Sequence, residues 1–286
     1  MDKSLVIFTS IVAIITMLLG AQFYIQPKDV PIIEEATNKP SEIQNNLSTV
    51  NAAEMPVNLN ANNNTTVSTT EVPINLATKV PIVMYHAVGD GPNDLFLQTN
   101  LFEQQIEYLS KNNYNFIDFE DIKNRKIPSK PILLTFDDGY KDVYDNAYPI
   151  LKKYNVKATI FLISKTIGTP DYLSLQDISE MNSIISFQSH SVSHPDLREL
   201  DIDKLEYEIR VSKETIQGIV NNNVIAFCYP SGKFNENIID ITKKYYNYGI
   251  STVSGFYTFK DDSYIMKRIR INKGDTLNIL KKKLLY

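Results

Sequence analysis

The stretch LLTFDDGY, from Leu133 to Tyr140, decides the fold of this chain. An apolar, strand-forming run leads directly into two adjacent aspartates, a glycine and a tyrosine. Neighbouring carboxylates repel each other, and neither can stay ionised in an apolar core without a partner. Asp137 and Asp138 therefore lie either on a solvated turn or beside a bound cation, and the surrounding sequence must distinguish the two.

Apolar runs alternate with amphipathic stretches from Lys79 onward. The expected strands are Val80–His86, Pro131–Phe136, Ala158–Ile163, Ile184–Ser189, Val224–Tyr229, Tyr248–Thr252 and Ile265–Ile271. The expected helices are Leu101–Lys111, Val143–Tyr154, Leu175–Met181, Asp201–Val220, Asn235–Tyr246 and Thr276–Leu284. This alternation predicts an α/β domain over residues 79–286, with a parallel sheet of about seven strands that is open or closed into a barrel.

Two segments precede this domain. Residues 1–26 contain an uncharged apolar run, Leu5 to Ala21, long enough to cross a bilayer as a helix. We expect a membrane anchor there, with a cleaved signal peptide as the alternative. Residues 27–78 are rich in Asn, Thr, Ser and Pro, which predicts a flexible, low-complexity linker. The α/β domain would then be extracellular, either held at the cell membrane by a single-pass helix or secreted.

The composition of the chain bears on nucleic-acid binding and on disulfide formation. The net charge of −4 gives no reason to expect nucleic-acid binding. Cys228 is the only cysteine, so an intramolecular disulfide is impossible. No feature of the sequence indicates an oligomer, and we expect a monomer.

Polar residues gather where the expected strands end. Asp137 and Asp138 follow one strand, His190 and His194 follow another, and His86 ends a third. A further strand runs into Tyr229, Pro230 and Gly232. Because the carboxyl ends of parallel strands meet at one edge of a sheet or one mouth of a barrel, these groups are expected to share a site.

Two imidazoles and one carboxylate form a facial set of metal ligands that leaves positions open for water. That set would use one of the two aspartates and leave the other free to accept a proton from bound water. Each motif also has a simpler interpretation. Asp-Asp-Gly is commonly a turn, and a His-x3-His pair is commonly solvated or capping.

The motifs TFDDGY (135–140), HSVSH (190–194) and CYPSGK (228–233) resemble those of the polysaccharide deacetylases, the carbohydrate esterase family with the chitooligosaccharide deacetylase homology domain. The opening PIVMYHAV (81–88), followed by LFEQQIEYL (101–109), resembles the branch that contains poly-N-acetylglucosamine and cell-wall deacetylases. The resemblance implies a distorted (β/α) barrel that hydrolyses N-acetyl groups and releases acetate.

The resemblance also implies a role for each residue. Asp137 would be the general base, and Asp138, His190 and His194 would bind one divalent metal, most often Zn²⁺, with Co²⁺, Ni²⁺ or Mn²⁺ as alternatives. The backbone N–H of Ser231 would stabilise the oxyanion. Substrate contacts would come from the residues around these motifs, namely Tyr140, Tyr229, Pro230 and Gly232.

The chain departs from the family pattern in two places. Many members carry a later histidine as general acid, but no histidine follows His194, so we assign the acid to His86. The alternative is that His86 is a structural, hydrogen-bonded histidine. The arginine that usually opens the third motif is replaced by Cys228, so Arg268 or Arg270 must hold the base, and we choose Arg268.

These residues predict metal-dependent N-deacetylation of N-acetylglucosamine units in an extracellular polysaccharide, either peptidoglycan or poly-N-acetylglucosamine. Two alternatives remain. One is a catalytically inactive carbohydrate-binding relic, and the other is an O-acetyl esterase that acts on a different polysaccharide.

Overall fold

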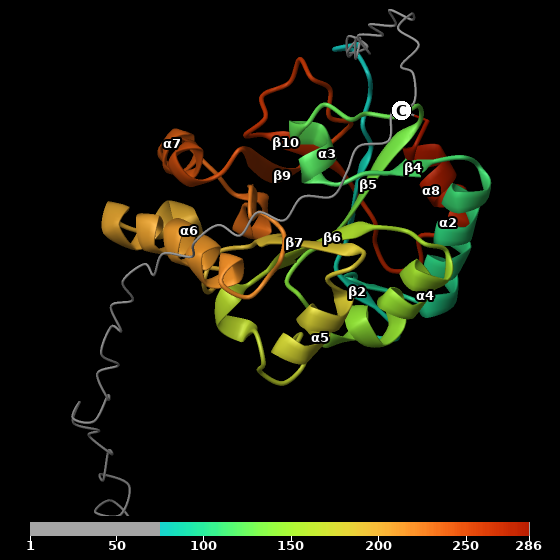
Figure 1. Cartoon of the computed structure of the whole chain (residues 1–286), viewed down its shortest axis with the longest axis horizontal. Helices are drawn as coiled ribbons and strands as arrows, with labels where there is room; N and C mark the ends of the chain where they lie inside the picture. The colour runs from blue at the N-terminus through green and yellow to red at the C-terminus, as the bar shows by residue number, and fades with distance from the viewer. Residues whose placement is uncertain (1–74, 286) are drawn as a thin grey trace, which may run out of the picture. The chain divides into compact units, whose positions relative to one another are not determined.

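Seven parallel strands form a closed barrel in the computed structural model, which describes residues 75–285 (Figure 1). Around the barrel the order is β1-β10-β9-β8-β7-β6-β5, and pairing of β5 with β1 closes the ring. The strands are β1 (Ile82–Tyr85), β5 (Pro131–Phe136), β6 (Ala158–Leu162), β7 (Ile185–Ser189), β8 (Ala226–Cys228), β9 (Tyr248–Ser254) and β10 (Met266–Arg270). The expected parallel α/β barrel is confirmed, and each of its strands overlaps an expected strand.

The strands read as nearly continuous apolar runs because both of their faces are covered. All six residues of β5 are buried, and their side chains alternate between two environments. Leu133 packs with Phe161 and Met266 in the cluster that fills the barrel. Ile132 and Leu134 pack in the larger cluster between the barrel and the outer helices. By the same alternation Asp137 follows Leu133 and Thr135 toward the barrel interior.

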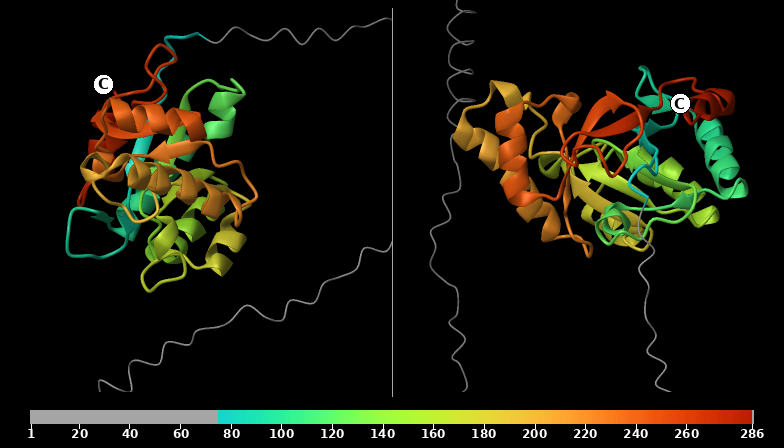
Figure 2. Two further views of the ribbon diagram at one scale, coloured as in Figure 1. Left: turned by 90° about the vertical axis from the view of Figure 1, so that its left-hand side faces the viewer. Right: turned by 90° about the horizontal axis from the view of Figure 1, so that it is seen from above.

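The outer helices form two groups on opposite flanks of the barrel (Figures 1 and 2). One group contains α6 (Ile202–Gln217) and α7 (Glu236–Tyr245), and the other contains α2 (Thr99–Lys111), α4 (Tyr148–Lys153) and α8 (Leu277–Lys283). The helix α5 (Leu175–Met181) precedes β7. Three short 3-10 turns complete the connections, namely η2 (Ser164–Thr166), η3 (Leu197–Glu199) and η4 (Pro230–Gly232).

The expected helix Val143–Tyr154 is divided in the structure. A π-helical turn, η1 (Val143–Ala147), precedes α4, which begins at Tyr148 with Pro149 in its first turn. Proline has no N–H to donate to the preceding turn, so a regular α-helix cannot run through this position without losing a hydrogen bond. The expectation of one continuous helix was therefore wrong at this point.

Four small elements were not expected from the sequence. They are β2 (Ala87–Val88), β3 (Phe96–Leu97), β4 (Asn115–Phe116) and α3 (Phe119–Lys123). The strand β4 adds to β5, and β2 pairs only with β3. The Phe119 ring of α3 packs against Phe161 and Tyr248, with ring centroids 5.9 and 5.7 Å away, and so joins the cluster inside the barrel.

The expected membrane anchor (1–26) and nearly all of the expected linker (27–78) lie outside the described residues. Within residues 75–285, no helix has both the length and the apolar character needed to span a bilayer.

Candidate active site

The two aspartates after β5 point to different partners. Asp138 has a φ of +73° and Gly139 a φ of +78°, so the chain turns sharply as it leaves the strand. At Gly139 a Cβ atom would lie 2.8 Å from the Leu162 side chain, and glycine is therefore required for this turn to pass β6. The turn directs the neighbouring carboxylates to separate places.

Arg268 of β10 holds the carboxylate of Asp137. Its Nη1 and Nη2 atoms donate to Oδ1 and Oδ2, both over 2.7 Å, and both residues are almost fully buried. Burial alone would raise the pKa of Asp137, but the charge and the two hydrogen bonds of Arg268 outweigh it and hold that pKa well below its usual range. Asp137 is therefore ionised at neutral pH, although it lies inside the barrel.

The other donors of Arg268 are also engaged. Its Nε donates to the Ser251 carbonyl over 2.9 Å, and its Nη1 donates to the Thr135 hydroxyl over 3.2 Å. Cys228 lies where the family motif has arginine, and its Sγ atom is 3.2 Å from Nη2 of Arg268. The small thiol leaves the space beside Asp137 that the guanidinium from β10 occupies.

Asp138, His190 and His194 form a set of converging ligands. The Oδ1 atom of Asp138 lies 3.4 Å from Nε2 of His190 and 3.7 Å from Nε2 of His194. The Nδ1 atom of His190 lies 2.8 Å from the Cys228 carbonyl, which can only accept, so the proton is on Nδ1 and the lone pair of Nε2 faces the site.

This donor set of two imidazoles and one carboxylate fits a divalent metal ion. The hydrogen bond from Nδ1 of His190 to the Cys228 carbonyl orients that imidazole for coordination through Nε2. Asp137, His190 and Cys228 also lie close together. Arg268 occupies the space beside both Asp137 and Cys228, however, and a cation there would face its charge. We therefore place the metal site at Asp138, His190 and His194.

Glu208 of α6 fixes the loop between the two histidines, and the sequence analysis missed it. Its carboxylate accepts from the backbone N–H of Val192 (2.9 Å) and of Ser193 (2.8 Å), and from the Ser193 hydroxyl (2.6 Å). Ser191 and His194 both have positive φ, so the loop takes a conformation that needs such support. The available signal was a glutamate on the buried face of a helix, where an unpaired carboxylate is costly.

His86 also lies beside Asp137. Its Nε2 atom is 3.9 Å from Oδ2 of Asp137, and its buried Nδ1 atom has no hydrogen-bond partner among residues 75–285. Burial lowers the pKa of His86, although the charges of Asp137 and Asp138 oppose this effect. The structure therefore brings the third histidine to the same site.

The CYPSGK segment forms a tight turn at the end of β8. Ser231 is exposed with φ +55°, while the backbone N–H groups of Gly232 and Lys233 donate to Tyr229 and Pro230. A Cβ atom on Gly232 would lie 2.0 Å from the Thr252 hydroxyl oxygen, so this residue must be glycine.

Two expected substrate residues of this turn are not on the surface. Tyr229 is fully buried, its ring packs against Phe227 and Phe234, and its hydroxyl donates to the Tyr264 carbonyl over 3.0 Å. Pro230 is also buried. The side chain of Tyr229 is therefore a core group and cannot contact a substrate, and Pro230 and Gly232 shape the turn that carries Ser231.

Tyr140 remains half-buried beside Asp138. The ring of Tyr140 stacks on Tyr172, and burial together with the charge of Asp138 raises the pKa of Tyr140 well above its usual range. Its hydroxyl therefore stays protonated and can donate a hydrogen bond.

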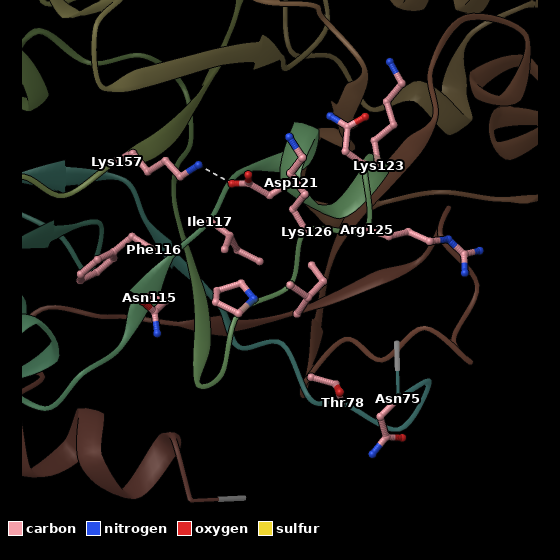
Figure 3. A pocket seen from close by; sticks show the side chains of 13 residues that line it. Asn75, Thr78, Asn115, Phe116, Ile117, Asp121, Lys123, Arg125, Lys126 and Lys157 are labelled. Atoms are coloured by element: carbon pink, nitrogen blue, oxygen red, sulfur yellow. Dashed lines mark hydrogen bonds and ion pairs between the residues drawn. The ribbon is translucent and has the colours of Figure 1, made fainter. Parts of the chain in front are cut away.

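A wide hollow lies elsewhere in the described structure (Figure 3). Its volume is about 1330 Å³, and Lys157, which precedes β6, lines it together with Asn75 and Thr78, which precede β1. The labelled Lys157 reaches toward Asp121 in this view, and the Nζ atom of Lys157 also lies 3.0 Å from Asp118. This hollow is at the amino-terminal end of the barrel strands, whereas the three histidines, Asp137 and Asp138 are at the carboxyl end.

Comparison with known proteins agrees with this geometry. A family model, polysaccharide deacetylase, matches residues 124–249. YxkH of Bacillus subtilis, named as a polysaccharide deacetylase, is 34% identical over 203 residues, which are 68% of this chain and 72% of YxkH. Poly-beta-1,6-N-acetyl-D-glucosamine N-deacetylase of Staphylococcus epidermidis is 27% identical over 200 residues, 63% of this chain and 69% of that protein.

A solved structure has the same fold. The deacetylase PplD of Streptococcus pyogenes, in complex with acetate, gives a TM-score of 0.68 at 33% identity, over 72% of this chain and 98% of that chain. The barrel and its site therefore define a hydrolase that cleaves carbon–nitrogen bonds other than peptide bonds. The chain belongs to the polysaccharide deacetylase family.

Proposed function

We propose that this protein removes acetyl groups from N-acetylglucosamine units of a polysaccharide in a metal-dependent hydrolysis. The observation that carries the proposal is the separation of two adjacent carboxylates. Asp137 is held ionised by Arg268, while Asp138 faces two imidazoles 3.4 and 3.7 Å away. A hydrolase of this kind needs both a proton acceptor and a metal ligand at one place.

The acetamide bond is broken by water. A divalent ion at Asp138, His190 and His194 would polarise the acetyl carbonyl and lower the pKa of a bound water. Asp137 would accept a proton from the attacking water as the oxygen of the water forms a bond to the carbonyl carbon. The backbone N–H of Ser231 donates to the carbonyl oxygen as negative charge develops there.

The leaving nitrogen must gain a proton as the carbon–nitrogen bond breaks. His86 is the one histidine of the chain outside the metal set, and its Nε2 atom lies 3.9 Å from the base. We assign it as the general acid. The products are acetate and a free amine on the sugar.

Similarity to the staphylococcal poly-beta-1,6-N-acetyl-D-glucosamine N-deacetylase supports an N-acetylglucosamine polymer as the substrate. Peptidoglycan also presents N-acetylglucosamine and is the second candidate polymer. Zinc is the proposed metal, because two imidazoles with one carboxylate are a common catalytic zinc set. The apolar run Leu5–Ala21 supports an extracellular domain that is anchored at the cell membrane or secreted.

Acetate release tests this proposal. The full chain, purified in mild detergent and stripped of metal with a chelator, is given N-acetylglucosamine oligomers or peptidoglycan, with and without zinc. We expect zinc-dependent release of acetate that is abolished by Asp137→Asn and by His86→Ala. Asp240→Asn changes an exposed aspartate of α7 and should behave as the wild type.

Each result has a distinct meaning. Release that survives His86→Ala would keep the deacetylase and remove His86 as the acid. Release that survives Asp137→Asn would exclude the proposed base. No release from any polymer by the zinc-loaded chain would contradict the proposed function and favour a binding relic or another acyl substrate.

A further inference from the structure

A stacked pair of tyrosines borders the metal ligands. Tyr140 follows Asp138 by two residues, and Tyr172 comes from the loop between β6 and α5. Their ring centroids are 5.3 Å apart and their planes differ by 27°. Both side chains are half-buried, so this aromatic surface is partly open to solvent.

The backbone holds this pair in place from both sides. Tyr140 and Tyr172 form an antiparallel bridge. The N–H of Lys141 donates to the Asp171 carbonyl over 2.8 Å, and the N–H of Leu173 donates to the Gly139 carbonyl over 3.0 Å. The rings therefore need no ordering when a ligand arrives, which lowers the entropic cost of binding.

An ion pair and a helix cap add to this support. The ammonium of Lys141 lies 2.7 Å from the carboxylate of Asp177. Asp177 also accepts from the N–H and hydroxyl of Ser174 at the start of α5. The loop that carries Tyr172 is thus tied to the segment that carries the aspartates.

A second tyrosine pair nearby differs from this one, because lysine ammonium groups lie over its rings. Tyr144 and Tyr148 stack at 5.8 Å, with the ammonium of Lys141 over Tyr144 at 4.1 Å and that of Lys152 over Tyr148 at 5.9 Å. Their hydroxyls both donate to Glu180. Within residues 75–285, no cation lies over Tyr140 or Tyr172 in this way.

We propose that Tyr172, with Tyr140, forms a sugar subsite that binds the unit next to the one being deacetylated. This inference rests on the proposed function and specifies its substrate as an oligomer of at least two sugars. The C–H face of a pyranose packs well against an aromatic ring. The chain has no tryptophan, so tyrosine and phenylalanine must supply any such surface. Tyr172 is a substrate-positioning residue in this account, because it touches a sugar that does not react.

The test compares two substrates of different length. The zinc-loaded full chain is assayed with a pentamer of N-acetylglucosamine and with 4-nitrophenyl acetate, which carries no sugar unit. We expect Tyr172→Ala to lower kcat/KM for the pentamer about tenfold, mainly through KM, and to leave the ester unchanged. Tyr172→Phe keeps the ring and should retain most of the activity. Tyr207→Ala removes an exposed tyrosine of α6 and serves as the control.

Two results would overturn the subsite. Wild-type kinetics of Tyr172→Ala on the pentamer would show that the ring binds no sugar. Equal losses on the pentamer and on the ester would show that Tyr172 only supports the loop of Asp138.

Binding separates this inference from the proposed reaction. The dissociation constant of the pentamer is measured by calorimetry on the zinc-loaded Asp137→Asn chain, with and without Tyr172→Ala. A roughly tenfold weakening supports the subsite even if no acetate is released by the wild type. Unchanged affinity, or no binding of the pentamer at all, contradicts it.

Discussion

Asp137 and Asp138 are neighbours in sequence, yet they occupy different electrostatic environments. Asp137 continues the inward alternation of β5 and meets the guanidinium of Arg268. Asp138 takes a left-handed backbone conformation, which turns its carboxylate toward His190 and His194. Two like charges are tolerated in adjacent positions because each faces its own set of positive or metal-binding groups.

Removing the guanidinium should shift the pH dependence of the reaction. In Arg268→Gln, the largest charge that opposes the effect of burial is removed, so the pKa of Asp137 rises. We expect the acid limb of the kcat/KM profile to move to higher pH, and kcat near pH 7 to fall. Profiles of the zinc-loaded variant and wild type, measured in the same buffers, check this expectation. Arg210→Gln, on the surface of α6, should leave the profile in place.

The same variant should lose stability in a pH-dependent way. Because the folded pKa of Asp137 lies below its unfolded value of about 3.9, its stabilisation is present above that pH and is lost as pH falls toward the folded pKa. Breaking a buried pair costs about 3–5 kcal/mol at neutral pH. Urea unfolding at several pH values measures the difference in free energy of unfolding between the wild type and Arg268→Gln. We expect this difference to become smaller as the pH falls below about 4. A difference that stays constant down to pH 3 would contradict the linkage.

Single residues were predictable from the sequence where the chemistry allowed few candidates. Only three histidines exist, and the structure brings all of them to one site. Arg268 was chosen as the partner of Asp137 because the usual arginine is replaced by Cys228. The guanidinium of Arg268 does donate to the carboxylate of Asp137. Tyr229 was misplaced, because strand alternation at the end of β8 turns its ring outward into the core between barrel and helices. Their roles in the reaction stay predictions until the variants are assayed.

At the scale of secondary-structure elements, the helix α6 supports the site by holding the loop that joins His190 to His194. The carboxylate of Glu208 on α6 satisfies two backbone donors and one hydroxyl of this loop. A glutamate that accepts three hydrogen bonds from this loop restrains the spacing of the two imidazoles. The helix therefore supports the proposed metal site although none of its residues is a proposed ligand.

Weakening this contact should weaken metal binding. Glu208→Gln replaces one acceptor oxygen by an NH₂ group, which cannot accept from the loop. We expect zinc affinity to fall about 10- to 100-fold, as is typical for residues that support metal ligands. Competition with a chromophoric chelator measures this affinity directly. Glu214→Gln on the same helix is the control, and equal affinities of the two variants would contradict the role of Glu208.

The long elements were predictable and the short ones were not. The strand β5 has a continuous apolar run, and α6 has an aspartate cap, Asp201, that accepts from the N–H of Lys204. Two-residue strands such as β2 and β4 are too short to show any periodicity. The helix α3 had a usable signal in the capping box of Asp118 and Asp121, which lies on only five helical residues.

The whole domain should be more stable with metal bound. The three ligands come from the ends of β5 and β7 and from the following loop, so an ion joins segments that are distant in the sequence. Free zinc at a thousand times its dissociation constant adds about 4 kcal/mol to the free energy of unfolding. For a domain of this size that raises Tm by about 10 °C. Differential scanning calorimetry of the stripped and zinc-loaded chain checks this, and His194→Ala should show little of the increase.

The barrel also separates the amino-terminal entry of the domain from its candidate active site. Asn75 and Thr78 line the hollow at the amino-terminal end of the strands, and His86 lies at the other end of β1, about 20 Å along the chain from Val80. The described chain therefore enters the domain at the end opposite the candidate active site. Immobilising the protein on a bead or a sensor surface through that end should therefore leave the candidate active site facing away from the support. A long polymer should then reach the site without contacting the support.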